Sequence, residues 1–191
     1  MTRMSLAERR HKLIAAALTV IREQGLASAT TRAIAAEAGM PLASFHYAFE
    51  SHQALLREAM TTLQESERER LEGLEIHGDS LEALCNGVLE QHLADVVARR
   101  DVHLGLLELV DQALRSPELR SLPAEWRAAR VTLLADKIDA IHGGAEPGDG
   151  ARLADALLMV VDGVTMRYLS TDDEQGTRRA MGAWLRQAVL A

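Results

Sequence analysis

The sequence predicts an all-α protein of about nine helices, and its composition carries that prediction. Hydrophobic residues make up 48% of the 191 residues, yet only 3% are aromatic. The apolar residues are mainly Ala, Leu, Val and Ile, a mixture that is typical of packed helices rather than of sheets. The chain has only four prolines and lacks the regularly spaced turn clusters that short strands would need.

The first helix is predicted over residues 6–24. Ser5 and Glu8 have the spacing of a capping box, in which the hydroxyl and the carboxylate each satisfy a backbone amide at the start of a helix. Apolar side chains then recur at helical spacing between residues 14 and 21. Gly25 is placed to end the helix.

Two shorter helices follow, and they are joined by a turn that contains Gly39. Either Thr30 or Thr31 can cap the second helix, which ends at Gly39. After the turn, residues 42–48 form the third helix. Two helices joined in this way and packed on a first helix have the outline of a helix-turn-helix. We therefore predict a three-helix, helix-turn-helix DNA-binding domain over residues 1–50.

The remaining residues, 51–191, are predicted to form a second, larger helical domain. Ser51 caps its first helix, Asp79 and Glu82 have the spacing of another capping box, and Pro123 suits the first turn of a helix. The Gly- and Pro-rich stretch at residues 143–150 predicts a loop. The helices of this domain are predicted at about residues 51–73, 79–100, 102–115, 123–142, 151–170 and 174–190.

Charge is distributed unevenly along the chain. Residues 1–50 carry six Lys or Arg and four Glu, whereas residues 51–191 carry 15 basic and 24 acidic residues. A mildly basic N-terminal part followed by an acidic remainder is typical of a protein that binds a polyanion with one end only. The alternative is that the pattern is chance variation. The net charge of −7 argues against a protein that coats nucleic acid indiscriminately.

Signal peptides, membrane spans and cysteine-based sites are disfavoured. The N-terminus lacks a charged and then apolar pattern, and no apolar run reaches the ~18 residues that a membrane span needs. Cys85 is the single cysteine, so an intrachain disulfide or a cysteine-based metal site cannot form. We expect a cytoplasmic protein that has no cofactor, no bound metal and no membrane association.

The third predicted helix has the properties of a recognition helix. Phe45 and Phe49 can fill a three-helix core, which leaves Ser44, His46 and Tyr47 on the exposed side, where they can reach base edges and phosphates. This helix contains neither Lys nor Arg. Phosphate contacts must therefore come from elsewhere in the domain, and we expect a shallow salt dependence of DNA binding.

The stretches TTRAIAAEAGM at residues 30–40 and SFHYAFESHQALL at residues 44–56 resemble the tetracycline-repressor (TetR) family of bacterial regulators. The resemblance covers about residues 10–60, and it depends on Gly25, Ile34, Gly39 and Phe49 occurring together. It implies a homodimeric repressor that binds a palindromic operator in double-stranded DNA. It further implies that a small molecule binds the C-terminal domain and releases the DNA, although an activator is the open alternative.

The resemblance also implies which residues contact DNA. Thr30 and Thr31 would hold a phosphate at the start of the second helix, and Arg32 would add charge there. Pro41 stands where the family often has a capping Ser, and His52 stands where a phosphate-contacting Lys is usual. The implied set is Thr30, Thr31, Arg32, Pro41, Leu42, Ala43, Ser44, His46, Tyr47 and His52.

The last two predicted helices are candidates for the dimer interface that the resemblance implies. Each carries an apolar stripe, and together the stripes contain Leu153, Leu157, Val160, Val161, Val164, Tyr168, Met181, Trp184, Leu185 and Ala188. A two-fold symmetric operator is bound by two DNA-binding domains, which favours a dimer. The alternative is that these two stripes close the core of a single chain.

A ligand site is predicted where polar side chains interrupt apolar helix faces in the second domain. The candidates are His92, His103, Trp126, Met159, Asp162 and Met166. Few Arg or Lys lie on these faces, which favours a small effector that is largely apolar or cationic. The alternative is ordinary, because a lone His on an apolar face is more often a core residue with a satisfied ring nitrogen.

Two other classes of function fit the sequence less well than a regulator does. An enzyme is disfavoured because the seven histidines show no local metal spacing, no Ser lies in a nucleophile elbow, and Cys85 sits on an apolar stripe. A ligand-independent architectural protein would share the helix-turn-helix but would lack a cavity. A screen for small molecules that raise the melting temperature distinguishes it from a ligand-responsive regulator.

Overall fold

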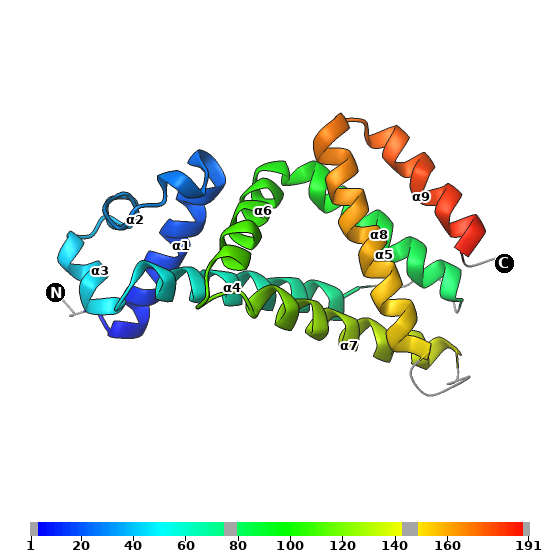
Figure 1. The fold of residues 1–191 in the computed structure, drawn as a ribbon, viewed down its shortest axis with the longest axis horizontal. Helices are drawn as coiled ribbons and strands as arrows, with labels where there is room; N and C mark the ends of the chain where they lie inside the picture. The colour runs from blue at the N-terminus through cyan, green and yellow to red at the C-terminus, as the bar shows by residue number, and fades with distance from the viewer. Residues whose placement is uncertain (1–3, 75–79, 143–148, 189–191) are drawn as a thin grey trace. The chain divides into compact units, whose positions relative to one another are not determined.

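The computed structural model describes residues 4–74, 80–142 and 149–188, except for the side chains of His142 and Ala188. Every regular element in these residues is helical, which confirms the all-α prediction (Figure 1). The α-helices are α1 (Leu6–Gln24), α2 (Thr31–Glu37), α3 (Leu42–Ala48), α4 (His52–Glu72), α5 (Leu81–Ala98), α6 (Arg100–Arg115), α7 (Leu122–His142), α8 (Asp149–Thr171) and α9 (Glu174–Ala188). A short 3-10 helix, η1 (Leu26–Ser28), lies between α1 and α2.

The predicted caps of the first two helices are present. The Glu8 amide donates to the Ser5 hydroxyl, and the Glu8 carboxylate accepts from the Ser5 amide at 2.7 Å. Thr30, rather than Thr31, caps α2, because its hydroxyl accepts a hydrogen bond from the amide of Ala33. Gly39 has a φ of +64°, a conformation that glycine adopts without strain, and it turns the chain from α2 to α3.

The start of α5 differs from the predicted capping box. Ser80 is the N-cap, and its hydroxyl accepts from the amide of Ala83 at 3.1 Å. Asp79, the predicted cap, lies outside the described residues, as does most of the predicted loop at 143–150. α8 begins at Asp149, slightly before its predicted start, so that Gly150 belongs to its first turn.

Packing divides the chain into two compact units. The first contains Met1–Ser66 and Leu104–Glu125, and the second contains Glu67–His103 and Trp126–Ala191. The predicted boundary near residue 51 falls inside the first unit, so it does not coincide with this division. α4 is a continuous helix that contributes residues to both units.

The first unit has its own hydrophobic core, and α6 belongs to it. Phe45 and Phe49 are fully buried in this core, as predicted, together with Leu109 of α6. α6 packs so closely on α1 that a Cβ at Gly105 would lie 2.9 Å from the side chain of Ile21. The carboxylate of Glu108 also accepts a hydrogen bond from the backbone amide of Leu26. α6 therefore braces the end of α1 and the start of η1.

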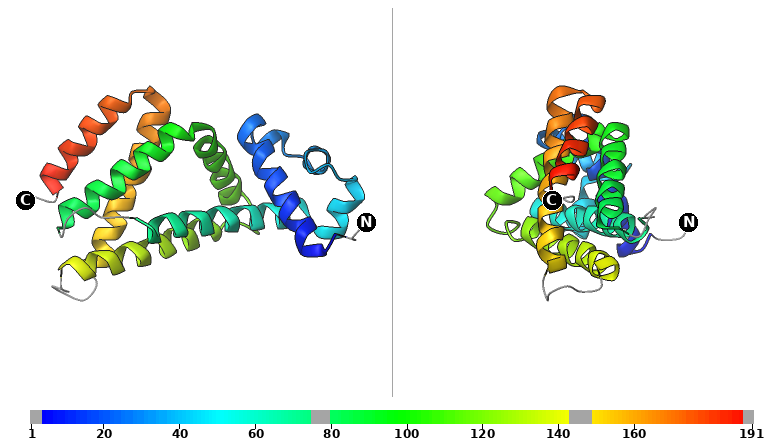
Figure 2. Two further views of the ribbon diagram at one scale, coloured as in Figure 1. Left: turned by 180° about the vertical axis from the view of Figure 1, so that it is seen from behind. Right: turned by 90° about the vertical axis from the view of Figure 1, so that its right-hand side faces the viewer.

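The second unit is built around α5, α8 and α9, which lie side by side (Figure 2). Leu84, Leu89, Leu93 and Val96 of α5 are buried in its core, with Leu134 of α7. α8 and α9 are joined by a tight connection at residues 172–173, where Asp172 has a φ of +51°.

Three general properties of the described residues bear on function. No helix among them is long and apolar enough to cross a membrane. They contain no cluster of three His, Cys, Asp or Glu side chains that could hold a metal ion. Cys85 is buried, and burial raises the pKa of its thiol to about 11, which keeps the thiol protonated and unreactive at neutral pH.

Candidate DNA-binding surface and ligand cavity

The exposed side of α3 is formed by fewer residues than the sequence suggested. His46 and Tyr47 are exposed, and the side chain of Tyr47 has 67% of its surface accessible. Pro41 and Ala43 at the start of the helix are also exposed, whereas Leu42 is half-buried. These residues lie on the first turn and on the outer side of α3. A recognition helix presents this part of its surface to base edges.

Ser44 does not lie on that exposed face. Only 8% of Ser44 is accessible, and its hydroxyl accepts a hydrogen bond from Nη1 of Arg9 at 2.7 Å. The prediction for Ser44 was therefore wrong: it lies one turn before Ala48 on the face that α1 covers. Its hydroxyl is used to hold an arginine from another helix.

Arg9 of α1 brings a cation to a helix that has none of its own. Its guanidinium carbon lies 5.5 Å from the centroid of the Tyr47 ring, a distance at which cation and ring attract. Nε of Arg9 is buried without a hydrogen-bond partner, and Arg9 has no carboxylate partner among the described residues. Its positive charge is therefore left uncompensated beside Tyr47. Sequence reasoning missed Arg9 because no local pattern links residue 9 to residue 47.

The neighbouring Arg10 has a structural role instead. Its Nη1 donates to the backbone carbonyl of Ala48 at the end of α3, and its guanidinium lies 4.4 Å from the Phe49 ring centroid. It also forms an ion pair with Glu58 of α4. Arg10 therefore ties α1, α3 and α4 together, and its charge is already neutralised.

The residues around the start of α2 are held by contacts of their own. Thr30 and Arg32 are exposed and Thr31 is half-exposed, as a phosphate contact would require. His52 is half-buried, and its Nε2 lies 2.7 Å from the carbonyl oxygen of Ala29. Because a carbonyl only accepts, Nε2 carries the proton of this bond. His52 thus anchors the segment before α2, and its Nε2–H is not available to a phosphate.

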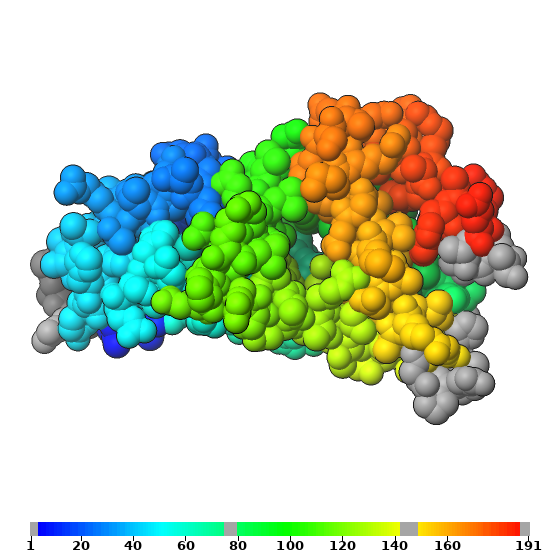
Figure 3. Space-filling model, in the orientation of Figure 1, coloured from blue at the N-terminus to red at the C-terminus, as the bar shows by residue number. Residues whose placement is uncertain are grey.

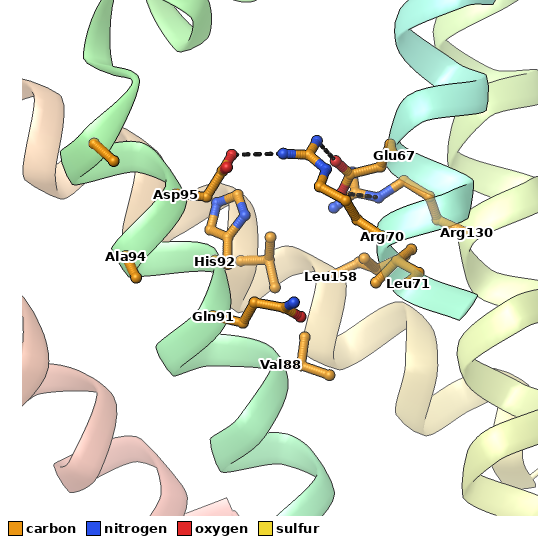
Figure 4. A pocket seen from close by; sticks show the side chains of 12 residues that line it. Glu67, Arg70, Leu71, Val88, Gln91, His92, Ala94, Asp95, Arg130 and Leu158 are labelled. Carbon is orange, nitrogen blue, oxygen red and sulfur yellow. Dashed lines mark hydrogen bonds and ion pairs between the residues drawn. The ribbon is translucent and has the colours of Figure 1, made fainter. Parts of the chain in front are cut away.

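A cavity of about 300 Å³ lies in the second unit, within the size range of small-molecule sites (Figure 4). Side chains from α4, α5, α7 and α8 face one another across it. Part of its wall is apolar, and the rest consists of charged or polar side chains. The lining residues are Glu67, Arg70, Leu71, Val88, Gln91, His92, Ala94, Asp95, Ala98, Arg130, Leu158 and Val161.

His92 is the one predicted ligand residue that lines this cavity. Its Nε2 lies 2.6 Å from Oγ1 of Thr165, whose hydroxyl donates to the carbonyl of Val161. Thr165 must then accept from His92, so Nε2 carries the proton. Burial, followed by the nearby His103, Arg130 and Arg70, lowers the pKa of His92 to about 3. The imidazole is therefore neutral at physiological pH.

The other predicted ligand residues do not line the cavity. His103 is buried beside it, where its Nε2 donates to Asp95 at 2.8 Å and its ring packs edge-on against His92. Trp126 is buried elsewhere, and its indole N–H has no hydrogen-bond partner among the described residues.

Met159, Asp162 and Met166 were assigned to the wrong side of α8. Met159 and Met166 are 59% and 53% exposed, and Asp162 pairs with Arg127 at 3.1 Å near the surface. The residues of α8 that line the cavity are Leu158 and Val161, which directly precede Met159 and Asp162 in the sequence. A shift of one residue, about 100° around a helix, separates the two faces.

Most of the residues predicted for the dimer interface belong to the core of the chain itself. Buried there are Leu157, Val161, Val164, Tyr168, Met181 and Leu185, and Val160 and Trp184 pack against them. Leu153 is 37% exposed, and the side chain of Ala188 lies outside the described residues. An apolar stripe predicts that one face of a helix is buried, but not whether the same chain or a second copy covers it. The predicted dimer interface was therefore wrong for the buried residues.

Comparison with known proteins identifies relatives of both parts of the chain. Residues 13–59 match the model of bacterial regulatory proteins of the tetR family, and residues 79–190 match the tetracyclin repressor-like C-terminal domain. The nicotine-responsive transcriptional repressor HdnoR of Paenarthrobacter nicotinovorans is 26% identical over 172 residues, covering 88% of this chain and 87% of that protein. The transcriptional regulator BetI of Agrobacterium fabrum is 31% identical over 162 residues, with coverages of 84% and 76%.

Solved structures of similar fold include a ligand complex. The multidrug binding protein EbrR in complex with malachite green is 30% identical, with a TM-score of 0.68 and coverages of 94% of this chain and 97% of that one. A transcriptional regulator from Rhodococcus sp. Rha1 has a TM-score of 0.78 at 23% identity, with coverages of 95% for both chains, and it supports the fold alone.

Proposed function

This chain belongs to the tetR family of bacterial regulatory proteins, and from that premise we propose that it is a ligand-responsive repressor. As a homodimer it binds a palindromic operator through α2 and α3. A small molecule that enters the cavity of the second unit releases the operator. The observation that carries this proposal is the presence in one chain of an exposed recognition surface and a cavity of about 300 Å³.

The proposed DNA contacts centre on α3. His46 and Tyr47 enter the major groove, and Arg9 supplies the cation beside them. Thr30, Thr31 and Arg32 position the domain on the backbone, together with Pro41, Leu42 and Ala43 at the start of α3. His52 contributes mainly by holding the carbonyl of Ala29. Ser44 acts only through Arg9.

The proposed dimer uses the exposed side of α8 in place of its buried stripe. Leu153, Met159 and Met166 leave apolar surface in solvent, and a side chain at Gly163 would meet nothing within 4 Å in the chain. Figure 3 shows α8 running along the surface of the molecule. Exposed methionines around a small residue are suited to close helix packing against a second copy.

The effector is proposed to be small, with a largely apolar body. Leu71, Val88, Leu158 and Val161 offer such a body an apolar wall. One relative is named as nicotine-responsive, and the multidrug binding protein was solved in complex with malachite green, so related proteins respond to or bind small molecules. Because α4 carries cavity residues and continues into the first unit, movement of α4 on ligand binding can change the separation of the two recognition helices.

Capture of genomic DNA fragments by the purified protein tests the operator proposal. We expect enrichment of palindromic sites whose half-sites lie about 34–36 Å apart along the DNA, the spacing of successive major grooves. A small-molecule library is then screened for compounds that both raise the melting temperature and release the captured operator. Compounds that stabilise the protein but never release DNA would contradict the proposed response. No stabilising compound at all would favour a ligand-independent architectural protein.

A further inference from the structure

The polar wall of the cavity contains two arginines and two carboxylates, and their partners show which of them is available to a ligand (Figure 4). Asp95 is fully engaged. One of its oxygens accepts from Arg70 and from His103, each at 2.8 Å, and the other accepts from Arg99 at 2.7 Å. Glu67 accepts from Nη2 of Arg70. A cationic ligand would have to displace arginines that already neutralise these carboxylates.

Arg130 is the charged group that lacks sufficient partners. Its side chain is only 16% exposed, and its buried Nε has no hydrogen-bond partner among the described residues. The nearest carboxylate oxygens belong to Glu67 and Asp162, and each lies 3.9 Å away, beyond hydrogen-bond distance. A guanidinium offers five donors in a planar fork, and burying them unpaired is costly.

The cavity wall holds equal numbers of arginines and carboxylates, but their pairing is unequal. Arg70 donates to both Glu67 and Asp95, whereas Arg130 lies 3.9 Å from its nearest carboxylate oxygens and donates to none of them. His92 is neutral, so it changes neither side of this balance. An anion placed against Arg130 would supply the acceptors that its guanidinium lacks.

We propose that the effector is a small monocarboxylate with an apolar body, and that its carboxylate binds the guanidinium of Arg130. This inference rests on the proposed role of the cavity as the effector site, and it specifies the chemical class of the effector. It replaces the expectation of an apolar or cationic ligand. That expectation considered the apolar helix faces alone, whereas Arg70 and Arg130 enter the cavity from α4 and α7.

The test is a binding series on the full chain with shape-matched probes. Straight-chain and phenyl-substituted monocarboxylates of about six to fourteen heavy atoms suit a cavity at the small end of the usual range, and each is paired with its amine and its alcohol. In isothermal titration calorimetry, each carboxylate should bind at least about tenfold more tightly than the matched amine and alcohol, as expected for charge-assisted hydrogen bonds. Equal or tighter binding of the amines, or no carboxylate binding at about 1 mM, would overturn the proposal.

The variants Arg130→Gln and Arg130→Lys locate the contact. Arg130→Gln should weaken the carboxylates about tenfold or more while leaving the alcohols unchanged, and Arg130→Lys should restore part of the loss because it keeps the charge. Arg127→Gln is the matched control, since Arg127 lies on the same helix but pairs with Asp155 and Asp162 outside the cavity. An undiminished carboxylate preference in a folded Arg130→Gln protein would also overturn the proposal.

Release of operator DNA is measured separately, so that the two proposals fail in different ways. If a carboxylate binds through Arg130 but leaves the operator bound, the assigned ligand class stands and the proposed response is wrong. If only amines or neutral compounds release the operator, the proposed response stands and the assigned ligand class is wrong.

Discussion

The guanidinium of Arg9 lies over the ring of Tyr47, 5.5 Å from its centroid, while the Nη1 of the same arginine donates to the buried hydroxyl of Ser44. Two residues of α3 thus hold a cation that comes from α1. A planar, pre-positioned guanidinium loses little conformational freedom when it meets a phosphate or a base. Although α3 contains neither Lys nor Arg, the surface around it therefore carries the positive charge of Arg9.

Arg9→Ala should weaken operator binding by about tenfold, because it removes a charge-assisted contact and the packing of Tyr47. The slope of log affinity against log salt should fall by about 0.9, the value for one phosphate contact. Fluorescence anisotropy across a salt series measures both quantities. Arg115→Gln, which removes an exposed arginine paired with Asp111 in the same unit, is the control. An unchanged slope would show that Arg9 does not contact phosphate.

Tyr47→Ala should abolish specific operator binding and leave the oligomeric state unchanged. Tyr47 is 67% exposed and contributes little to the core, so the loss reflects the DNA contact rather than folding. Gel shifts report the affinity, and light scattering reports the mass. Retention of a wild-type gel shift by this variant would contradict the role assigned to α3.

The double substitution Met159→Glu with Met166→Glu should convert the proposed dimer to a monomer. Each residue is more than half exposed in the chain, so the substitutions spare its core but place like charges in the proposed interface. Sedimentation measures the mass. Leu114→Glu, which changes an exposed leucine in the first unit, should leave the dimer intact. A double variant that remains dimeric would place the interface elsewhere.

Stability should fall with acid in a way that depends on His92. The folded protein holds the pKa of His92 near 3, below the ordinary value of 6.5, so between these values the unfolded state binds more protons. The stabilisation is therefore complete above pH 6.5 and is lost as the pH falls, by up to about 1.4 kcal/mol per pH unit for this one group. Urea unfolding from pH 7.5 to 5 should show a smaller decline for His92→Gln, which can still donate to Thr165. Parallel declines in both proteins would contradict the assignment.

The elements of the fold could be predicted because their signals are local. The capping box at Ser5 and Glu8, the positive φ at Gly39 and the apolar periodicity of α1 depend on neighbours within one or two turns. The same is true of Phe45 and Phe49, whose burial follows from their spacing on α3. The sequence by itself therefore determined the helices, the helix-turn-helix and the exposed position of Tyr47.

Only the tertiary structure decided which polar side chains meet. Arg9 reaches Ser44 across 35 residues of sequence, and no periodicity encodes such a contact. On α8, Leu158 and Val161 are buried whereas Met159 is exposed, although both faces carry apolar residues. Only packing against α5 and α9 distinguishes the two faces. The cavity and its under-paired Arg130 likewise arise where four helices converge, and long-range packing alone sets that convergence.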